Sequence, residues 1–421
     1  MKAKNRLPLY TLYATSLISA TGDVMAAVAV PWFVLQTTGS AAMMGIAAFF
    51  AVLPIALAML FGGTIVDRIG YKRASVFADL ASGLTMLMIP VLHLTIGIEF
   101  WQLVLLVFLG NLLDAPGRSA RQVMIPELAE AADVSLERAT GLANAFSRAT
   151  TMFGAPLAGI LIGLTGAPIV LLINAITFLV SAIGIQLFIS QQLFAKQTQA
   201  QQESTNSYLE DFKEGFAFLR QDKLLLTIII VVMITNMIDQ ALSGVTTPYY
   251  ANEVYGTAWS LGLMMGSFGA AAVVGTLLYS AFGEKFSRRW VFIIAFMLVG
   301  VRSFFMMLYP PLAWMVAFFL IDGMAAGPIN PIIGVISYER IPAEIRARVF
   351  GLTSAGVLIA MPVGGLLAGY MLEWFGLTTA LAIYGVIYVL AIGSLIFNPD
   401  ANELDRSEAP PVPDTVAPET A

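Results

Sequence analysis

The sequence has no cysteine and only one histidine, His93, among its 421 residues. Without cysteine there is no disulfide framework, no thiolate metal site and no cysteine nucleophile. A single histidine cannot build a histidine metal site. We therefore expect neither a metal nor another cofactor, and the lack of any catalytic constellation argues against an enzyme.

Charged residues are also scarce, at 12% of the chain, which is about half of their share in an ordinary soluble domain. The net charge of −5 does not suit a partner such as a nucleic acid. The chain has no Gly-x-x-x-x-Gly-Lys-Ser/Thr loop for a nucleotide. Soluble enzymes, nucleic-acid binders and ATP-driven machines are therefore disfavoured.

Hydrophobic residues make up 58% of the chain, and a membrane-spanning helix needs roughly 20 of them. Hydropathy and Gly/Pro punctuation predict an all-α polytopic membrane protein with twelve transmembrane helices, because unpaired backbone groups are too costly in lipid for other structures. The first apolar stretch is too long for a cleaved signal peptide. The predicted spans are 9–36, 41–66, 74–95, 100–122, 141–165, 168–190, 224–250, 259–282, 290–308, 312–336, 349–372 and 376–398.

Every Lys and Arg except Arg148 and Arg302 falls in the termini and alternate connections, on one side of the predicted membrane. Basic loops stay in the cytoplasm. We therefore expect a multi-pass protein of the bacterial cytoplasmic (inner) membrane with both termini cytoplasmic.

A polar stretch divides the spans into two groups of six. We expect an N-terminal six-helix bundle (1–190), a cytoplasmic linker (191–223), a C-terminal six-helix bundle (224–398) and a disordered acidic, Pro-rich tail (399–421). Residues 208–223 of the linker form an amphipathic helix that lies either at the membrane interface or against the bundle.

The two groups also match each other as a repeat. Asp23 and Asp239 are as far apart as Lys72 and Arg288. Parallel six-span repeats are typical of transporters whose halves rock about a midplane site.

The connection between the second and third spans reads GGTIVDRIGYKR (62–73). A glycine can take the positive φ of a tight reversal, an acid can face the positive end of a neighbouring helix, and basic residues can hold the loop at an anionic surface. We expect a conformational gate, the alternative being a topology anchor. Its residues are Gly63, Asp67, Arg68, Gly70, Lys72 and Arg73.

With this loop and the repeat, the sequence resembles the major facilitator superfamily over residues 8–398. The family's signature is Gly-x-x-x-Asp-Arg-x-Gly-Arg-Arg/Lys, and Tyr71 stands where the family usually has a basic residue. The resemblance implies two pseudo-symmetric six-helix bundles around a central cavity lined by the first and seventh spans.

Further segments resemble the branch of proton-linked drug exporters that includes macrolide efflux proteins and the enterobactin exporter. They read TGDVMAAVAVPWFVLQTTGS (21–40), IPEL (125–128), NAFSRATTMFGAPLAGILIG (144–163) and YLEDFKEGFAFLR (208–220). The third is similar to the antiporter motif Gly-Pro-x-x-Gly-Gly, with Ala155 inserted and Ala158 replacing one Gly. The alternative for these small residues is helix packing alone. The stripe in the fifth and eleventh spans consists of Gly154, Pro156, Gly159, Pro362 and Gly365.

Several ionisable residues lie inside the spans, where charges are costly and usually functional. Their depth along the helices pairs Asp114 with Arg148, and Arg302 with Asp322, as intramembrane ion pairs. Arg118 is a competing partner for Asp114.

Asp23 and Asp239 have no basic neighbour in the sequence and lie near the midplane. A carboxyl in a low-dielectric cavity can exchange a proton, or attract a cationic substrate, as its surroundings change. With Asp114, they are our candidates for proton coupling or substrate charge recognition; the alternative is a permanently protonated Asp in a helix–helix hydrogen bond. Asp79 is expected to be a helix-start charge.

Aromatic and Met side chains near the same spans could line a cavity for varied apolar ligands, although most must face lipid or other helices. The candidates are Trp32, Phe33, Phe49, Asn236, Met237, Tyr249 and Asn330.

We therefore expect a monomeric secondary transporter in the lipid bilayer that exports hydrophobic or amphipathic small molecules in exchange for protons. One alternative is an exporter of a single metabolite such as a siderophore. Another is a lipid flippase or a membrane protein that transports nothing.

Overall fold

The computed structural model describes residues 6–191, 208–342, 345–398 and 403–405; within these ranges, the side chains at 58–65, 67–68, 151, 208–214, 284 and 347 are not described. The first helices are α1 (Leu7–Thr38), α2 (Ala41–Ile69), α3 (Tyr71–Thr95), α4 (Phe100–Ala132), α5 (Leu136–Thr165) and α6 (Ala167–Phe188). The later ones are α8 (Tyr208–Gln221), α9 (Lys223–Ala241), η3 (Leu242–Thr246), α10 (Thr247–Tyr250), η4 (Ala251–Tyr255), α11 (Ala258–Phe282), η5 (Gly283–Lys285), α12 (Arg288–Met306), α13 (Leu312–Ala326), α14 (Ile329–Arg340) and α15 (Arg346–Phe397). The predicted all-α membrane architecture is confirmed.

Ten helical stretches of the described chain are long and apolar enough to cross a membrane, and the described part of α2 adds a shorter apolar one. The segments α9 to η4 form one such stretch, Lys223–Tyr255. The 52-residue α15 contains two predicted spans, which meet at Gly376. Its φ of +76° is open to glycine and strained for other residues, so the chain can reverse there. Twelve spans result.

Helix α4 is longer than predicted, because it continues ten residues past the expected end at 122, to Ala132. Pro116 and Pro126 lie inside it without ending it. Arg118 and Arg121 lie before the expected end and on the same helix as Asp114.

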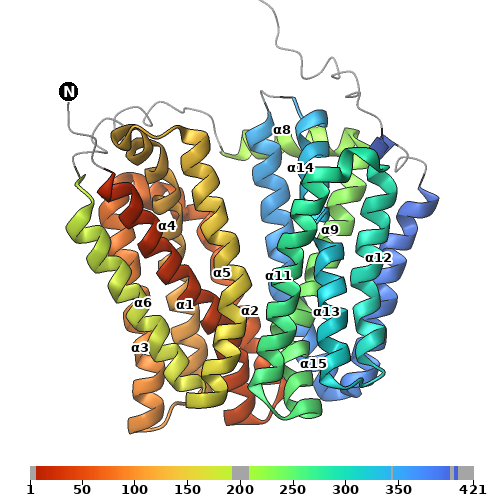
Figure 1. The fold of residues 1–421 in the computed structure, drawn as a ribbon, viewed down its shortest axis with the longest axis horizontal. Coiled ribbons are helices and arrows are strands. Elements are labelled where there is room, and N and C mark those ends of the chain that lie inside the picture. The colour runs from red at the N-terminus through yellow and green to blue at the C-terminus, as the bar shows by residue number, and fades with distance from the viewer. Residues whose placement is uncertain (1–5, 192–207, 343–344, 399–402, 406–421) are drawn as a thin grey trace, which may run out of the picture.

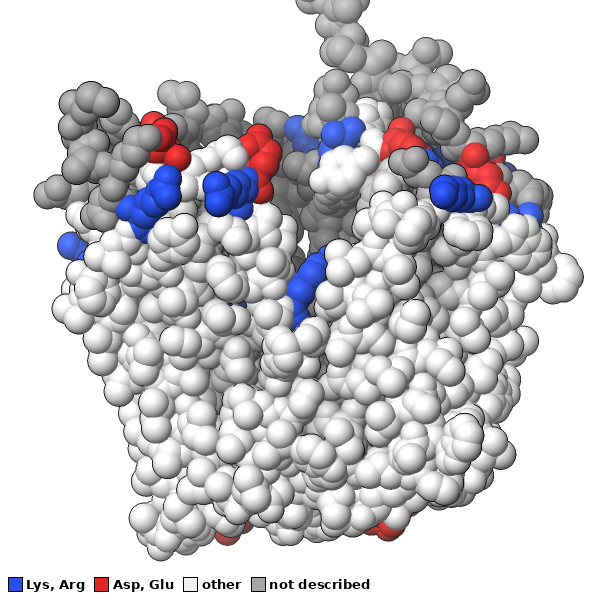
Figure 2. All heavy atoms as spheres, in the orientation of Figure 1, with Lys and Arg blue, Asp and Glu red and all other residues white. Residues whose placement is uncertain are grey.

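The helices form two groups, with α1–α6 in one and α9–α15 in the other, and the start of α1 and α8 lie on the same face (Figure 1). We call this the α8 face, and the opposite one the far face. Basic and acidic side chains gather along the α8 face, while the band below is almost free of charge (Figure 2). This distribution suits a membrane around the band.

The two groups touch near the far face through glycines. A Cβ added to Gly45 of α2 would lie 2.8 Å from the Cα of Gly369 on α15, and one added to Gly159 of α5 would lie 2.5 Å from the Cα of Gly262 on α11. Because glycine has no side chain, the backbones of the two helices can approach closely at each crossing. Beside the first crossing, the Ser40 hydroxyl donates a 3.1 Å hydrogen bond to Glu373.

The α8 helix lies against α9 and α15. Its Phe218 and Leu219 are 5% and 4% exposed, whereas Phe216 is 48% exposed. Phe218 and Leu219 therefore pack against the bundle, and a position of this helix at the membrane interface stays a prediction.

Three residues of the expected disordered tail are instead packed. Leu404 is buried, Glu403 pairs with Arg340 at 3.0 Å, and Asp405 accepts hydrogen bonds from Ser287 and from the backbone N–H of Arg289 at the start of α12. Leu404 is an apolar side chain that can be buried, and Asp405 beside it accepts a hydrogen bond at the start of α12, so the two hold this segment against the bundle. The polar composition of the tail as a whole did not predict this contact. The rest of the tail lies outside the described residues.

Candidate functional site

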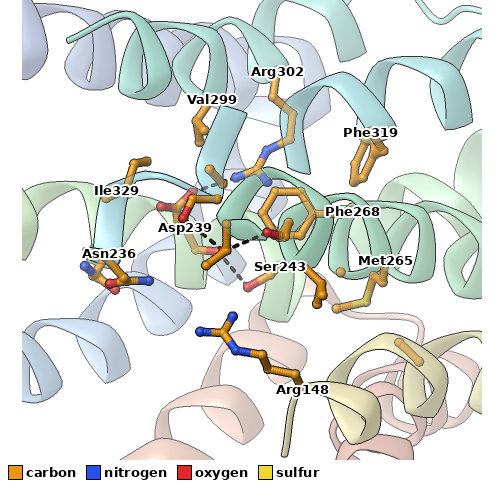
Figure 3. A pocket seen from close by; sticks show the side chains of 18 of the residues that line it. Arg148, Asn236, Asp239, Ser243, Met265, Phe268, Val299, Arg302, Phe319 and Ile329 are labelled. Carbon is orange, nitrogen blue, oxygen red and sulfur yellow. Dashed lines mark hydrogen bonds and ion pairs between the residues drawn. The ribbon is translucent and has the colours of Figure 1, made fainter. Parts of the chain in front are cut away.

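A cavity of about 590 Å³ lies between the two groups of helices. We call it the main cavity (Figure 3). Its wall is mostly apolar and includes Val24, Met265, Phe268, Phe296 and Phe319. A second cavity of about 400 Å³ shares Val232, Asn236, Asn330 and Ile333 with it and extends to Leu219 of α8. The shared residues join the main cavity to the α8 face, where Figure 2 shows a hollow between the groups.

A cluster of charges borders the main cavity. Arg302 of α12 donates to Asp239 Oδ1 of α9 at 2.6 Å and to Asp322 Oδ2 of α13 at 3.2 Å, and the Tyr388 hydroxyl donates to Asp239 Oδ2 at 3.4 Å. We call these four residues the C-cluster. Arg302, Tyr388 and Asp239 lie on the cavity wall; of the two acids, Asp322 is fully buried, whereas the Asp239 side chain is 37% exposed and faces the cavity.

The other group of helices holds a second cluster. Arg121 of α4 binds Asp79 at 2.6 Å and Asp114 at 3.3 Å, and Arg118 binds Asp114 and, at 3.4 Å, Asp23 of α1. We call these five residues the N-cluster. Ser181 of α6 also donates to Asp79 at 2.6 Å.

The N-cluster borders a cavity of its own. This cavity, of about 270 Å³, is lined by Asp23, Asn111, Arg118, Asn174 and Gln240, among apolar residues. Val24 and Ala27 lie on its wall and on that of the main cavity. Both clusters therefore lie next to one central space.

Several sequence-based pairings need correction. Asp114 pairs with its competing partner Arg118 and with Arg121 rather than with Arg148, because both arginines follow it on the same face of α4. Asp79 is a buried partner of Arg121, not a helix-start charge.

Asp23 and Asp239, which have no basic neighbour in the sequence, each have a basic partner on another helix. Arg118 lies in the fourth span and Arg302 in the ninth, so the repeat that relates the two acids does not relate their partners. The expected pair of Arg302 and Asp322 is present, with Asp239 as a third member.

Arg148 of α5 lies on the wall of the main cavity, and its side chain is exposed. It has no ion pair or hydrogen bond to another side chain in the described part of the protein. Figure 3 shows its guanidinium extending into the cavity from the wall opposite Arg302, with Asp239 and Ser243 between them in this view.

The expected cavity lining is only partly on the wall. Asn236 and Asn330 lie there, whereas Trp32 and Phe33 are 3% and 2% exposed and belong to the packed core. Three other candidates, Phe49, Met237 and Tyr249, are partly buried but are not on the main cavity's wall.

The sequence analysis missed Ser243, Met265, Phe268, Phe296 and Phe319. Ser243 is one helical turn from Asp239, so helical spacing could have found it. The others are apolar residues in apolar helices, where no local signal marks the cavity side.

In the gate loop, Gly70 has a φ of +87° at the reversal between α2 and α3. The Lys72 ammonium donates to the carbonyl oxygen of Gln186 at 2.9 Å, and Arg73 is exposed. The side chains of Asp67 and Arg68, and the surroundings of Gly63, lie outside the described residues.

In the predicted stripe, Gly159 and Pro156 face α11, at Gly262 and Gly266, while Gly154 faces Val24 of α1. Gly365 faces Ala48 of α2, and Pro362 lies inside α15. Gly159 and Gly365 thus lie at the contacts between the two groups.

Two groups of six spans around a mostly apolar central cavity with a few charged and polar residues define a multi-pass membrane transport protein. The family model for the Major Facilitator Superfamily matches residues 12–261 and 229–419. The chain belongs to this superfamily, as the signature loop and the repeat predicted.

Curated relatives cover nearly the whole chain. The chain is 28% identical to the multidrug efflux pump Tap of Mycolicibacterium fortuitum, over 97% of this chain and 100% of that protein. It is 21% identical to macrolide efflux protein A of Streptococcus pyogenes, over 91% of this chain and 94% of that protein, which confirms the resemblance to macrolide efflux proteins.

Among solved structures, the nucleoside transporter NupG has the same fold. Its TM-score is 0.77 at 13% identity, over 93% of this chain and 98% of that one.

Proposed function

We propose that the protein is a secondary active transporter that exports hydrophobic or amphipathic, drug-like molecules in exchange for protons by alternating access. The main cavity carries the proposal, since an apolar, aromatic wall with a few polar groups suits drug-sized ligands. Its volume of about 590 Å³ is in the range for such sites. The names of the multidrug and macrolide efflux relatives support export of such compounds.

Proton exchange follows from the charges of the two clusters. The C-cluster has two carboxylates for one guanidinium, and the N-cluster has three for two. Each is one positive charge short at membrane depth, where an uncompensated charge is costly. Each cluster can therefore take up one proton and become neutral, and its acid at the central space is Asp239 on the wall of the main cavity or Asp23 on the wall of the N-cluster's cavity.

Alternating access follows from where the two groups touch. They meet near the far face at the glycine crossings, and the cavities lead to the α8 face. In this scheme the bundles 1–190 and 224–398 rock as units joined by the linker 191–223. The α8 face is then cytoplasmic, in a bacterial inner membrane, and one chain suffices.

The test is transport by purified protein in liposomes with an imposed pH gradient. The panel contains a macrolide, a neutral dye and an anionic naphthalene dye. We expect the gradient to drive at least two unrelated compounds, and the rate to fall at least tenfold in a Asp23→Asn/Asp239→Asn double variant. Glu137→Gln, on the exposed first turn of α5, is the matched control.

An unchanged gradient-driven rate in the double variant would contradict proton coupling by these acids. Transport of one compound with no competition from the others would favour the single-metabolite exporter. Movement of labelled lipid alone would favour the flippase.

A further inference from the structure

The main cavity has two charged features that its apolar wall does not neutralise. One is the C-cluster, whose excess negative charge reaches the cavity through Asp239. The other is Arg148, a cation on the opposite wall in Figure 3, with no ion pair among the described residues.

Arg148 is not a rim residue. It is the thirteenth residue of α5, which begins at Leu136 on the α8 face, and so lies about 18 Å along the helix axis. A guanidinium at that depth is costly unless it is hydrated or paired, and it cannot lose its charge. The cavity supplies space for an anionic group of a ligand.

Arg302 cannot serve in its place. It already binds Asp239 and Asp322 and is 5% exposed, so both of its outer nitrogens are occupied. Among the cavity's cations, Arg148 is therefore the one available to a ligand. Asp239, in contrast, offers a partly exposed carboxylate in a cluster that has two acids and one arginine and is therefore one positive charge short.

We propose that the site selects zwitterionic amphipaths: an apolar body lies against Met265, Phe268 and Phe319, an anionic group binds Arg148, and an ammonium group binds Asp239. The inference rests on the proposed function and names its substrate class. The ammonium group supplies the positive charge that the proton otherwise supplies to the C-cluster. Binding of the ligand therefore releases that proton, which is what exchange of substrate for proton requires. The anionic group neutralises the charge of Arg148. Each charge of the ligand is then paired with an opposite charge of the cavity.

The test is a charge cycle on one scaffold. The probes are 3-(1-pyrenyl)alanine (a zwitterion), its amide (a cation), its N-acetyl derivative (an anion) and its N-acetyl amide (neutral). Binding is measured by fluorescence polarisation with the protein in lipid nanodiscs, and empty nanodiscs serve as the blank. Because a charge-assisted hydrogen bond is the strong kind, we expect the zwitterion to bind at least tenfold more tightly than the cation or the anion.

Variants separate the two charges. Arg148→Gln should make the zwitterion and the cation bind equally, and Arg148→Lys should restore part of the difference. Asp239→Asn should make the zwitterion and the anion bind equally. Arg138→Gln, which removes an exposed arginine from the same helix outside the cavity wall, should change nothing.

The proposal is overturned if wild-type protein shows no preference for the zwitterion, or if Arg148→Gln keeps it. A loss of binding of all four probes in Arg148→Gln, with Arg148→Lys restoring none, would also overturn it. These measurements need no gradient, so absent transport with an intact charge cycle would refute only export. Gradient-driven transport of the neutral probe without charge preference would refute only the substrate class.

Discussion

At the scale of single residues, Arg302 holds the C-cluster together. Its two outer nitrogens bind carboxylates from two different helices, α9 and α13, and it is 5% exposed. Removing it would leave Asp322, which is fully buried, without a countercharge. Removing Asp239 would leave the pair of Arg302 and Asp322 intact.

The two members should therefore differ in their effect on stability. We expect Arg302→Met to lower the free energy of unfolding by about 3–5 kcal/mol, the usual cost of breaking a buried pair from one side. Asp239→Asn should cost clearly less, because Asn still accepts a hydrogen bond. Thermal unfolding of the purified protein measures both.

Arg288→Met is the control for that comparison, since Arg288 and Glu339 form a 2.8 Å pair whose side chains are 33% and 29% exposed. Such pairs are worth about 1 kcal/mol or less. Equal losses of stability in Arg302→Met and Arg288→Met would show that Arg302 does not have the structural role described.

At the scale of elements, the contacts between α5 and α11 and between α2 and α15 hold the far face closed. At both crossings glycines face each other, so the backbones approach without side chains between them. Adding even a small side chain at such a contact forces the backbones apart, because no flexible side chain is present there that could move aside. In the proposed alternating-access cycle, the equilibrium between far-face-closed and far-face-open states should therefore respond to a single methyl group.

Gly159→Ala tests this, because its Cβ would meet the Cα of Gly262 at 2.5 Å. Gly163→Ala, one turn along α5, is the matched control, since a Cβ there has nothing within 4 Å. The natural chain has no cysteine, so a Ser40→Cys/Glu373→Cys pair reports on the far face without background.

We expect a bifunctional thiol reagent to cross-link this pair at least twofold less in Gly159→Ala than in Gly163→Ala. Equal cross-linking in the two variants would mean that the glycine crossing does not control the far face.

At the scale of the whole molecule, hydropathy was enough to predict twelve spans, because lipid demands long apolar helices wherever the chain crosses. The cavity wall was harder to predict. Asn236 and Asn330 stood out as polar residues in apolar helices, but Phe268 could not be told from Phe33, which is buried in the core.

Charge pairs depend on contacts between helices that sequence spacing does not contain. Asp239 meets Arg302 across 63 residues of chain. The pairing of Asp114 with Arg148 was wrong for a local reason: Arg118 and Arg121 lie one and two turns from Asp114 on the same helix and bind its carboxylate, a competition that depth along the helices did not decide. Sequence depth alone also could not show that Arg148 faces a cavity.

The most direct test of the account is the number of protons released when substrate binds, measured in weakly buffered detergent solution with any compound that the liposome assay shows to be transported. Each cluster lacks one positive charge, so wild-type protein should release up to about two protons per bound molecule. Asp239→Asn should release about one fewer, and the Asp23→Asn/Asp239→Asn variant none, while Glu137→Gln behaves as wild type. The same release from all four proteins would contradict the claim that substrate and protons compete at these clusters.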